Sequence, residues 1–433
     1  MAYWNEELET KPKEELQKMQ LELLRENLRT MYDSSELVRK RMDSVGLLPE
    51  DIDSFETFRK MPFMHKSDLR DNYPDGLFVK PYHELVRVHV SSGTTGTPTV
   101  VGYTQNDLDN WAESLNRGMV SFGMNKDDML QNFHGYGLFT GGLGVHYAAE
   151  RMGVTVLPIG TGNTERQIKM MQDLPITVFA GTPSYMFHIA DVCDRKGIDI
   201  RKDTKVRKAI AGGEPWSESM RTKLQERTGI RVHNCYGASE FYGPMFLECE
   251  KQSGLHIWAD LAYIEILDKD GNPCADGERG EIVITMLKKE AFPLIRYKIG
   301  DISALTWEKC ECGRTHPRLM RISGRTDDML IVRGVNVFPS QIEGVLGGFD
   351  FLAPFYNIVL TNENFMDVMV VEVEISEDSL TEDTVKLDKM TRTVEASLKN
   401  ELNVKAEVRM VLPGTLKRFE GKSSHVEDLR RYD

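Results

Sequence analysis

The chain of 433 residues lacks any run approaching 18 apolar residues, so no membrane-spanning helix is expected. Residues 1–7 are acidic and hold no apolar stretch, which argues against a secretory signal peptide and favours a cytoplasmic location. A basic excess is also missing, because the formal net charge is −13, and this argues against a nucleic-acid partner. Basic clusters in such an acidic chain become candidate sites for anionic ligands.

Cysteine is scarce, with six residues spread unevenly. In a reducing compartment they are expected to be free or metal-bound rather than disulfide-linked. Cys310 and Cys312 form a tight Cys-x-Cys turn, and Cys249 and His256 lie upstream. Four such ligands would suit a closed tetrahedral structural Zn²⁺ site, with His316 as a rival for the fourth position. The spacing differs from the familiar Cys-x-x-Cys pairs, so free thiols stay open as the alternative.

What the chain does contain is a loop of serine, threonine and glycine at 91–98, between strand-like segments at 86–90 and 99–103. Glycines allow close backbone approach, and backbone N–H groups in a tight turn form a concavity for anions. The loop has no lysine, so it is not a Walker A sequence. A flexible hairpin turn is the plainer alternative, but the loop is predicted to bind a polyphosphate.

The organisation of the chain predicts an α/β fold with layered sheets, because short apolar runs alternate with amphipathic segments over 86–330. Helical spacing over 5–45 predicts two helices, broken near 33–35. Thr104 and Asp107 resemble a capping box and predict a helix start after the hairpin.

The pattern changes near Arg325, beyond which a compact α+β unit is expected. The predicted domains are 1–326 and 327–433, with a hinge at Asp327. The second unit should contain a strand at 329–332, a helix from about 340, strands near 357–360 and 367–375, a helix near 385–402 and a strand near 405–412.

Further segments line up in order with the Ser/Thr/Gly loop: Ala211–Pro215, Asn234–Glu240, Gly300–Asp301, Gly324–Asp327 and Gly421–Lys422. This ordered set resembles the adenylate-forming superfamily of acyl-CoA ligases, luciferases and peptide-synthetase adenylation domains. Two more segments are similar to the phenylacetate-CoA ligase family within it: Gly135–Gly142 and Arg333–Pro339.

The resemblance implies a fold and a reaction. The fold would be a large multi-layered N-terminal adenylate-forming domain with a smaller, mobile α+β C-terminal domain. In the first half-reaction an aryl carboxylate would attack the α-phosphate of ATP, with Mg²⁺, to give an acyl-adenylate and pyrophosphate. In the second, the thiol of coenzyme A would attack the acyl carbon and release AMP. Positioning and charge stabilisation should dominate the phosphoryl step.

The resemblance also assigns roles at the nucleotide. Tyr236 would face the adenine, Glu240 would act in catalysis by coordinating Mg²⁺, and Asp301 would accept hydrogen bonds from the ribose. Their plainer alternatives are a core aromatic, a solvated glutamate and a turn residue. The full predicted ATP and AMP set is Ser92, Thr94, Thr95, Gly213, Glu214, Pro215, Asn234, Cys235, Tyr236, Gly237, Ser239, Asp301 and Arg325.

The remaining assignments concern the acyl group, the thiol and the C-terminal tail. Lys422, in a basic patch, would be catalytic, although a solvated tail is the alternative. The acyl pocket would be built from Tyr136, Phe139, Gly212 and Ala238. The approach of coenzyme A would be lined by Arg333, Gly334 and Val335.

Other functions stay open beside the aryl-acid ligase. The same fold could serve another aromatic acid or load a carrier protein, and a homodimer is compatible with either. A non-catalytic nucleotide- or zinc-binding module is a different class, against which the intact Glu240, Asp301 and Lys422 argue. A zinc hydrolase is disfavoured, since the chain has no His-Glu-x-x-His segment.

Overall fold

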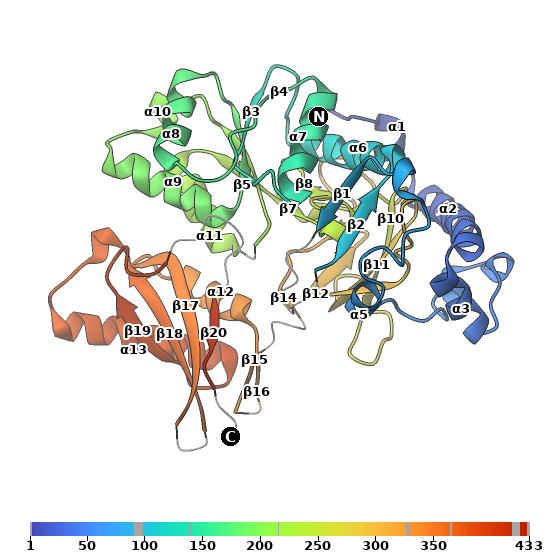
Figure 1. Cartoon of the computed structure of the whole chain (residues 1–433). Coiled ribbons are helices and arrows are strands. Elements are labelled where there is room, and N and C mark those ends of the chain that lie inside the picture. The colour runs from blue at the N-terminus through green and yellow to red at the C-terminus, as the bar shows by residue number, and fades with distance from the viewer. Residues whose placement is uncertain are drawn as a thin grey trace.

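The computed structural model describes residues 2–90, 98–138, 140–214, 216–325, 330–333, 335–363, 366–417 and 425–430. Figure 1 shows a large N-terminal part, from blue to yellow, and a smaller C-terminal part in orange and red. None of the described helices is long and apolar enough to cross a membrane.

The chain opens with helices that pack on the large sheet domain. They are α1 (Glu6–Glu9), α2 (Lys13–Ser34) and α3 (Glu36–Ser44). The predicted break is confirmed at Ser35, whose hydroxyl accepts from the Val38 N–H and caps α3. Short helices follow at α4 (Phe55–Phe58) and α5 (Lys66–Asp71), with 3₁₀ turns at Pro49–Asp51 and Tyr82–Glu84.

The predicted hairpin is present as β1 (Arg87–Val90) and β2 (Val100–Tyr103), paired antiparallel. The helix after it, α6 (Gln105–Ser121), begins at the predicted capping box. Asp107 N–H donates to the Thr104 hydroxyl at 3.1 Å, and Thr104 N–H donates to the Asp107 carboxylate at 3.1 Å. The local sequence therefore sets the start of this helix.

One half of the central twelve-stranded sheet is parallel, and it has the predicted α/β alternation. Its strands are β3 (Met129–Asn132), β4 (Thr155–Leu157), β5 (Val178–Gly181), β6 (Lys208–Ala211) and β7 (Arg231–Tyr236). Its helices are α7 (Thr140–Met152), α8 (Thr164–Asp173), α9 (Pro183–Arg195), α10 (Ile200–Asp203) and α11 (Glu218–Thr228). Every residue of β5 is buried, as expected for a parallel strand covered on both faces.

The other half of the sheet is antiparallel, and here the alternation of strands and helices stops. Its strands are β8 (Phe246–Glu248), β9 (Leu255–His256), β10 (Ala262–Leu267), β11 (Arg279–Met286), β12 (Tyr297–Thr306), β13 (Arg318–Leu319) and β14 (Gly324–Arg325). A 3₁₀ turn at Ser239–Phe241 (η3) joins β7 to this half. The two halves meet at β7, which pairs with β6 in parallel and with β8 antiparallel.

The C-terminal part has its own hydrophobic core and a four-stranded sheet in the order β19-β18-β17-β20. The expected elements are present: β15 (Leu330–Val332), α12 (Pro339–Gly347), β17 (Leu352–Glu363), β18 (Met366–Ile375), α13 (Thr384–Leu402) and β19 (Glu407–Val411). Sequence reasoning missed β16 (Val335–Val337) and β20 (Val426–Asp428), with a 3₁₀ turn at Glu377–Ser379. The predicted hinge, Asp327, lies outside the described residues.

Candidate active site

Among the described residues, those predicted to bind the nucleotide and the acyl group lie mainly where the parallel strands end. The loops after β3, β5, β6 and β7 all leave the sheet at its carboxyl edge, because these strands run in one direction. In open α/β sheets, ligands bind outside the carboxyl ends of the strands. The topology therefore brings together segments that lie up to about a hundred residues apart in the sequence.

Tyr236, Asp301 and Arg325 form one connected group. The Tyr236 hydroxyl donates to Asp301 Oδ2 at 2.6 Å, and the Arg325 guanidinium contacts Asp301 Oδ1 at 3.0 Å. Asp301 and Arg325 also face each other across the β12–β14 pair. Burial, followed by the charge of Asp301, holds the pKa of Tyr236 well above its usual value, so the phenol stays a donor at neutral pH.

Glu240 lies on η3, directly after β7, and is half-buried. Its Oε1 accepts a hydrogen bond from the Tyr297 hydroxyl at 3.2 Å. The neighbouring Ser239 hydroxyl is 3.5 Å from that of Thr140 at the start of α7. One carboxylate is enough for Mg²⁺ when substrate phosphates and water complete its ligands, so the half-buried Glu240 fits the predicted Mg²⁺ role.

Glu214 and Gly212 occupy the turn after β6. Glu214 accepts hydrogen bonds from the Ser184 N–H at 2.6 Å and from its hydroxyl at 3.0 Å, at the start of α9. A Cβ on Gly212 would lie 2.4 Å from Cys235 Sγ and 2.5 Å from its carbonyl oxygen, so only glycine fits. Gly213 has φ of +86°, which also favours glycine.

Asn234 and Cys235 have structural contacts in this state. The side-chain amide oxygen of Asn234 accepts from the Trp216 indole N–H at 2.9 Å. The backbone N–H of Asn234 donates to the Glu248 carboxylate at 2.9 Å. Burial raises the pKa of Cys235 to about 12, so its thiol is an inert packing group, as the sequence suggests. Ala238 is half-buried against the main core, and a Cβ on Gly237 would lie 2.7 Å from Gly243.

Tyr136, predicted to line the acyl pocket, is fixed between β3 and α7. Its hydroxyl lies 2.9 Å from the Asn132 amide nitrogen and 3.1 Å from His146 Nδ1. Burial raises the pKa of Tyr136 to about 12, so the phenol stays protonated at neutral pH. Two residues further along the loop, the Leu138 carbonyl oxygen accepts from the Val90 N–H of β1 at 3.1 Å.

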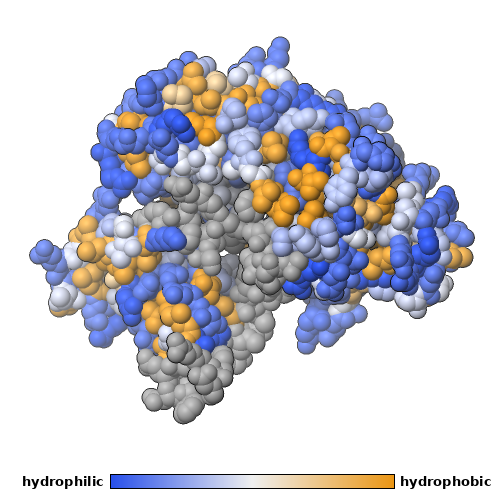
Figure 2. All heavy atoms as spheres, in the orientation of Figure 1, coloured by the Kyte–Doolittle hydropathy of each residue, from blue (hydrophilic) through white to orange (hydrophobic). Residues whose placement is uncertain are grey.

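An apolar surface borders this segment. Val86, Val88 and Leu138 are exposed, with 63% of Leu138 open to solvent. Figure 2 shows hydrophobic residues gathered on the face that carries β1 and β2. The surface next to the Gly135–Leu138 segment is thus apolar.

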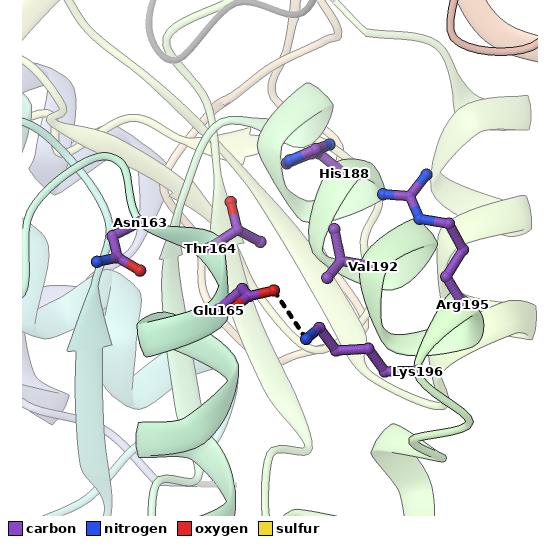
Figure 3. Close-up of a pocket in the computed structure, with 7 residues that line it drawn as sticks. All are labelled: Asn163, Thr164, Glu165, His188, Val192, Arg195 and Lys196. Carbon is purple, nitrogen blue, oxygen red and sulfur yellow. Dashed lines mark ion pairs between the residues drawn. The ribbon is translucent and has the colours of Figure 1, made fainter.

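A cavity of about 490 Å³ lies elsewhere, between α8 and α9. Figure 3 shows the Glu165–Lys196 ion pair of 2.8 Å that bridges these helices, with His188 and Arg195 nearby. None of the predicted site residues lines this cavity. It is therefore separate from the candidate active site.

Two of the predicted coenzyme A residues lie away from the strand ends. Arg333 sits at the turn between β15 and β16 with φ of +52°, and its Nε donates to the Asp367 carbonyl at 2.7 Å. Val335 begins β16, and Figure 1 shows this hairpin at the lower right edge of the C-terminal part, below the strand ends. Several predicted residues lie outside the described ones: Ser92, Thr94, Thr95, Phe139, Pro215, Asp327, Gly334 and Lys422.

The predicted metal ligands Cys249, His256, Cys310 and Cys312 come together, with their ligand atoms all within 4.8 Å of one another. Cys249 Sγ is 3.7 Å from Cys310 Sγ, and Cys312 Sγ is 3.4 Å from His256 Nε2. All four are buried. Hydrogen bonds from the neighbouring thiols hold the pKa of Cys310 far below its usual range, which favours the thiolate that a metal binds.

The structure excludes His316 as the fourth ligand in this state. Its Nδ1 accepts from the Ala259 N–H at 3.0 Å, and its Nε2 lies 2.8 Å from the Leu8 carbonyl oxygen. Both ring nitrogens are therefore engaged with the backbone. Through these contacts His316 ties the N-terminal segment to the Trp258–Ala259 backbone, close to His256.

Sequence reasoning missed Tyr297, which contacts Glu240. Its place in the chain could have pointed to it, because Tyr297 begins β12, the same strand that carries Asp301. It also missed Tyr103, whose hydroxyl donates to the Ser239 carbonyl, and the buried Lys289 beside it. No pattern in the sequence links these two to the site, because they reach it from other elements.

The matches to known families define the class of this protein. The model of the AMP-binding enzyme family matches residues 34–286, and that of the AMP-binding enzyme C-terminal domain matches residues 334–430. The chain belongs to the AMP-binding enzyme family. Within it, the chain is 42% identical to the phenylacetate-coenzyme A ligase of Thermus thermophilus, over 98% of this chain and 99% of that protein.

Solved structures of 2-hydroxyisobutyryl-CoA ligase share the whole architecture at 28–29% identity. The postadenylation state, in complex with R3-HIB-AMP, superposes with a TM-score of 0.92 and covers 98% of this chain and 92% of that one. The thioesterification state, in complex with 2-HIB-AMP and CoA, superposes with a TM-score of 0.73 and covers 99% of this chain and 92% of that one. Both structures are of one ligase, and the present structure is more similar to its postadenylation state than to its thioesterification state.

Proposed function

We propose that the protein is an AMP-forming ligase that joins phenylacetate, or a related aryl acid, to coenzyme A. The observation that carries the proposal is the near full-length similarity to a phenylacetate-coenzyme A ligase, at 42% identity. The connected Tyr236, Asp301 and Arg325 group at the strand ends supports it, because this group offers donors and acceptors for a nucleoside.

In the first half-reaction, a carboxylate oxygen of the acid attacks the α-phosphorus and pyrophosphate leaves. Asp301 accepts hydrogen bonds from the ribose hydroxyls, and Tyr236 places its ring against the adenine. Glu240 holds Mg²⁺ against the phosphates, and the Ser/Thr/Gly loop at 91–98 supplies N–H and hydroxyl donors. These groups position the reactants and offset negative charge without forming covalent bonds to them.

Lys422 is proposed to bridge the acyl and phosphate oxygens in this first step. In the second step the thiol attacks the acyl carbon, the bond to AMP breaks, and AMP departs with the electron pair. Rotation about Asp327 would carry Lys422 away and bring Arg333 towards the acyl carbon. The position of the β15–β16 hairpin, away from the strand ends, is compatible with a state that precedes this rotation.

The Cys249, His256, Cys310 and Cys312 cluster is proposed to hold one structural Zn²⁺. Three thiol sulfurs and one imidazole nitrogen are a donor set that zinc prefers in tetrahedral sites. Four protein ligands leave no position for an activated water, so the metal would support the fold and take no part in the ligase reaction.

A pyrophosphate-release screen across aryl, fatty and amino acids tests the substrate class. Phenylacetate-like acids with ATP and Mg²⁺ should give the highest kcat/KM, and coenzyme A should yield the thioester without a carrier protein. Near neighbours should also react, since an apolar pocket discriminates one methylene by only about 1–3 kcal/mol. Faster turnover of long-chain fatty acids than of every aryl acid would overturn the assignment.

Lys422→Ala separates the two half-reactions. Pyrophosphate release from acid and ATP should fall by about 10²–10³ or more, as for loss of one preorganised charge-stabilising donor. Presynthesised acyl-adenylate and coenzyme A should still give the thioester at close to the normal rate. Lys417→Ala is the matched control, and adenylation that survives in Lys422→Ala would reassign the role.

A further inference from the structure

Lys289 is a buried cation without an ion-pair partner among the described residues. Only 1% of its surface is exposed, and its Nζ lies 3.5 Å from the Gly102 carbonyl oxygen on β2. Burying an unpaired ammonium costs folding free energy, and an apolar residue of the same size would avoid that cost. Stability alone therefore does not explain a lysine here.

Three aromatic rings surround the ammonium. Its Nζ lies 4.3 Å from the ring centre of Tyr103, 4.8 Å from that of Tyr242 and 4.6 Å from that of Phe292. Cations are attracted to aromatic faces at such distances, most strongly where water is excluded. The charge of Lys289 thus holds the two tyrosines in fixed positions.

These two tyrosines flank Glu240. The Tyr103 hydroxyl donates to the carbonyl oxygen of Ser239, just before Glu240. Tyr242 ends the same turn with φ of +73°, a conformation that non-glycine residues rarely adopt. Its hydroxyl donates to Asp107 Oδ1 at 2.7 Å, which anchors the turn from the other side.

We infer that Lys289 is a positioning residue for the nucleotide-binding carboxylate: it holds Tyr103 and Tyr242 against the Ser239–Phe241 turn and so orients Glu240 towards Mg-ATP. Burial lowers the pKa of Lys289 to about 8, and the nearby charges of Asp107 and Glu240 oppose this shift by stabilising the protonated ammonium. This inference rests on the role proposed for Glu240.

Lys289→Met tests it, because methionine keeps the length of the side chain and removes the charge. The apparent affinity for Mg-ATP in pyrophosphate exchange should fall about 10- to 100-fold, as when a group that orients a metal ligand is removed. The KM for the aryl acid should change less than threefold. The melting temperature should stay the same or rise, since an unpaired buried charge is lost.

Lys13→Met is the matched control. Lys13 also lies over an aromatic ring, 5.1 Å from that of Trp307, but it is exposed and remote from Glu240. This variant should leave Mg-ATP affinity unchanged. A purely structural role for Lys289 predicts the opposite pattern: a lower melting temperature, with KM for Mg-ATP unaltered.

Tyr103→Phe examines the link itself, because it keeps the ring beside Lys289 and removes only the bond to Ser239. It should weaken Mg-ATP affinity, and combining it with Lys289→Met should add little, since both act through one contact. The inference is overturned if the wild type is active and the Mg-ATP affinity of Lys289→Met lies within twofold of the wild-type value. A wild type inactive with every acid would instead overturn the proposed function.

Discussion

Tyr236 and Asp301 are 65 residues apart in the chain, yet a 2.6 Å hydrogen bond joins them. Asp301 therefore has two roles to separate: it holds a phenol, and it is proposed to bind the ribose. Binding the ribose requires the carboxylate. Loss of the hydrogen bond to Tyr236 alone would change only the surroundings of the Tyr236 ring.

We expect Asp301→Ala to raise the KM for ATP by about 10- to 100-fold, because one or two hydrogen bonds to a charged acceptor are worth about 1.5–3 kcal/mol each. Tyr236→Phe, which keeps the ring and removes only the bond to Asp301, should have a smaller effect. Steady-state pyrophosphate release at varied ATP measures both. Asp270→Ala, in an exposed turn, is the control. Equal effects in Asp301→Ala and Tyr236→Phe would mean that Asp301 only holds the tyrosine.

At the scale of elements, the turn after β6 and the end of β7 are packed too closely for any side chain at Gly212. A Cβ there would overlap both the sulfur and the backbone carbonyl oxygen of Cys235. The backbone oxygen cannot be moved aside by a rotamer change, so the two strand ends would have to separate.

Gly212→Ala should therefore lower the free energy of unfolding by roughly 1–3 kcal/mol, the usual cost of overpacking, and should weaken adenylation as well. Chemical denaturation and pyrophosphate release measure the two effects. Gly344→Ala is the control, since a Cβ at Gly344 meets nothing within 4 Å and lies in a helix. That change should stabilise the protein by about 0.5–1 kcal/mol. A fully stable, active Gly212→Ala would contradict the steric argument.

The cysteine and histidine cluster joins three elements: the ends of β8 and β9 and the segment between β12 and β13. The N-terminal segment packs on it through the buried Arg314–Glu9 ion pair. Loss of the cluster should therefore loosen the contact between the N-terminal helices and the sheet.

Freshly purified protein should contain about one zinc per chain by elemental analysis. Cys312→Ser should lose the metal and melt at a lower temperature, while the adenylation rate at low temperature changes little. Cys274→Ser, at a partly exposed cysteine outside the cluster, should keep both metal and stability. Wild-type protein free of zinc before any chelator is added would contradict the metal assignment.

At the scale of the whole molecule, α12 connects the C-terminal part to the strand ends. Glu343 of α12 is 5% exposed and accepts from the Tyr356 hydroxyl at 3.3 Å. Burial, together with the charge of Glu214, raises the pKa of Glu343 to about 7, although Arg321 and the Ser217 backbone oppose this. Lys223 of α11 also reaches across this boundary and donates to the Phe349 carbonyl oxygen at 2.8 Å, with the charge of Asp350 acting on the same lysine.

This arrangement should be pH-dependent. The pKa of Glu343 is higher when the C-terminal part is docked than when Glu343 is solvated, so docking takes up a proton. The contribution of Glu343 to the stability of the docked state is therefore full below about pH 4.5 and is lost as the pH rises through about 7. Small-angle X-ray scattering between pH 5.5 and 8.5 should show the C-terminal part separating at the higher pH.

Glu343→Gln should remove most of this dependence and keep the two parts docked. Glu401→Gln, at an exposed position of α13, should behave like the wild type. The half-buried His425 stacks on Tyr356, and burial lowers its pKa, so it favours the neutral imidazole. A scattering profile that is constant with pH, or equally variable in Glu343→Gln, would exclude the mechanism.

The sequence alone determined the elements whose signals are local. The capping box at Thr104, the break at Ser35 and the ordered motifs that mark an AMP-binding enzyme depend on neighbouring residues, and they could be predicted. The set of metal ligands could also be proposed, because few residue types bind zinc. The antiparallel half of the sheet was missed, since its strands are bounded by pairing partners far along the chain.

Only the tertiary structure decided how these parts act together. It chose His256 over His316, because the nitrogens of His316 are engaged with the backbone. It also brought Tyr297 and Tyr103 to the Ser239–Glu240 turn, and Glu343 close to Glu214. The physical reason is that hydrogen bonds, cation–π contacts and carboxylate repulsion depend on distances of a few ångströms. Sheet topology sets those distances, and no short stretch of sequence contains them.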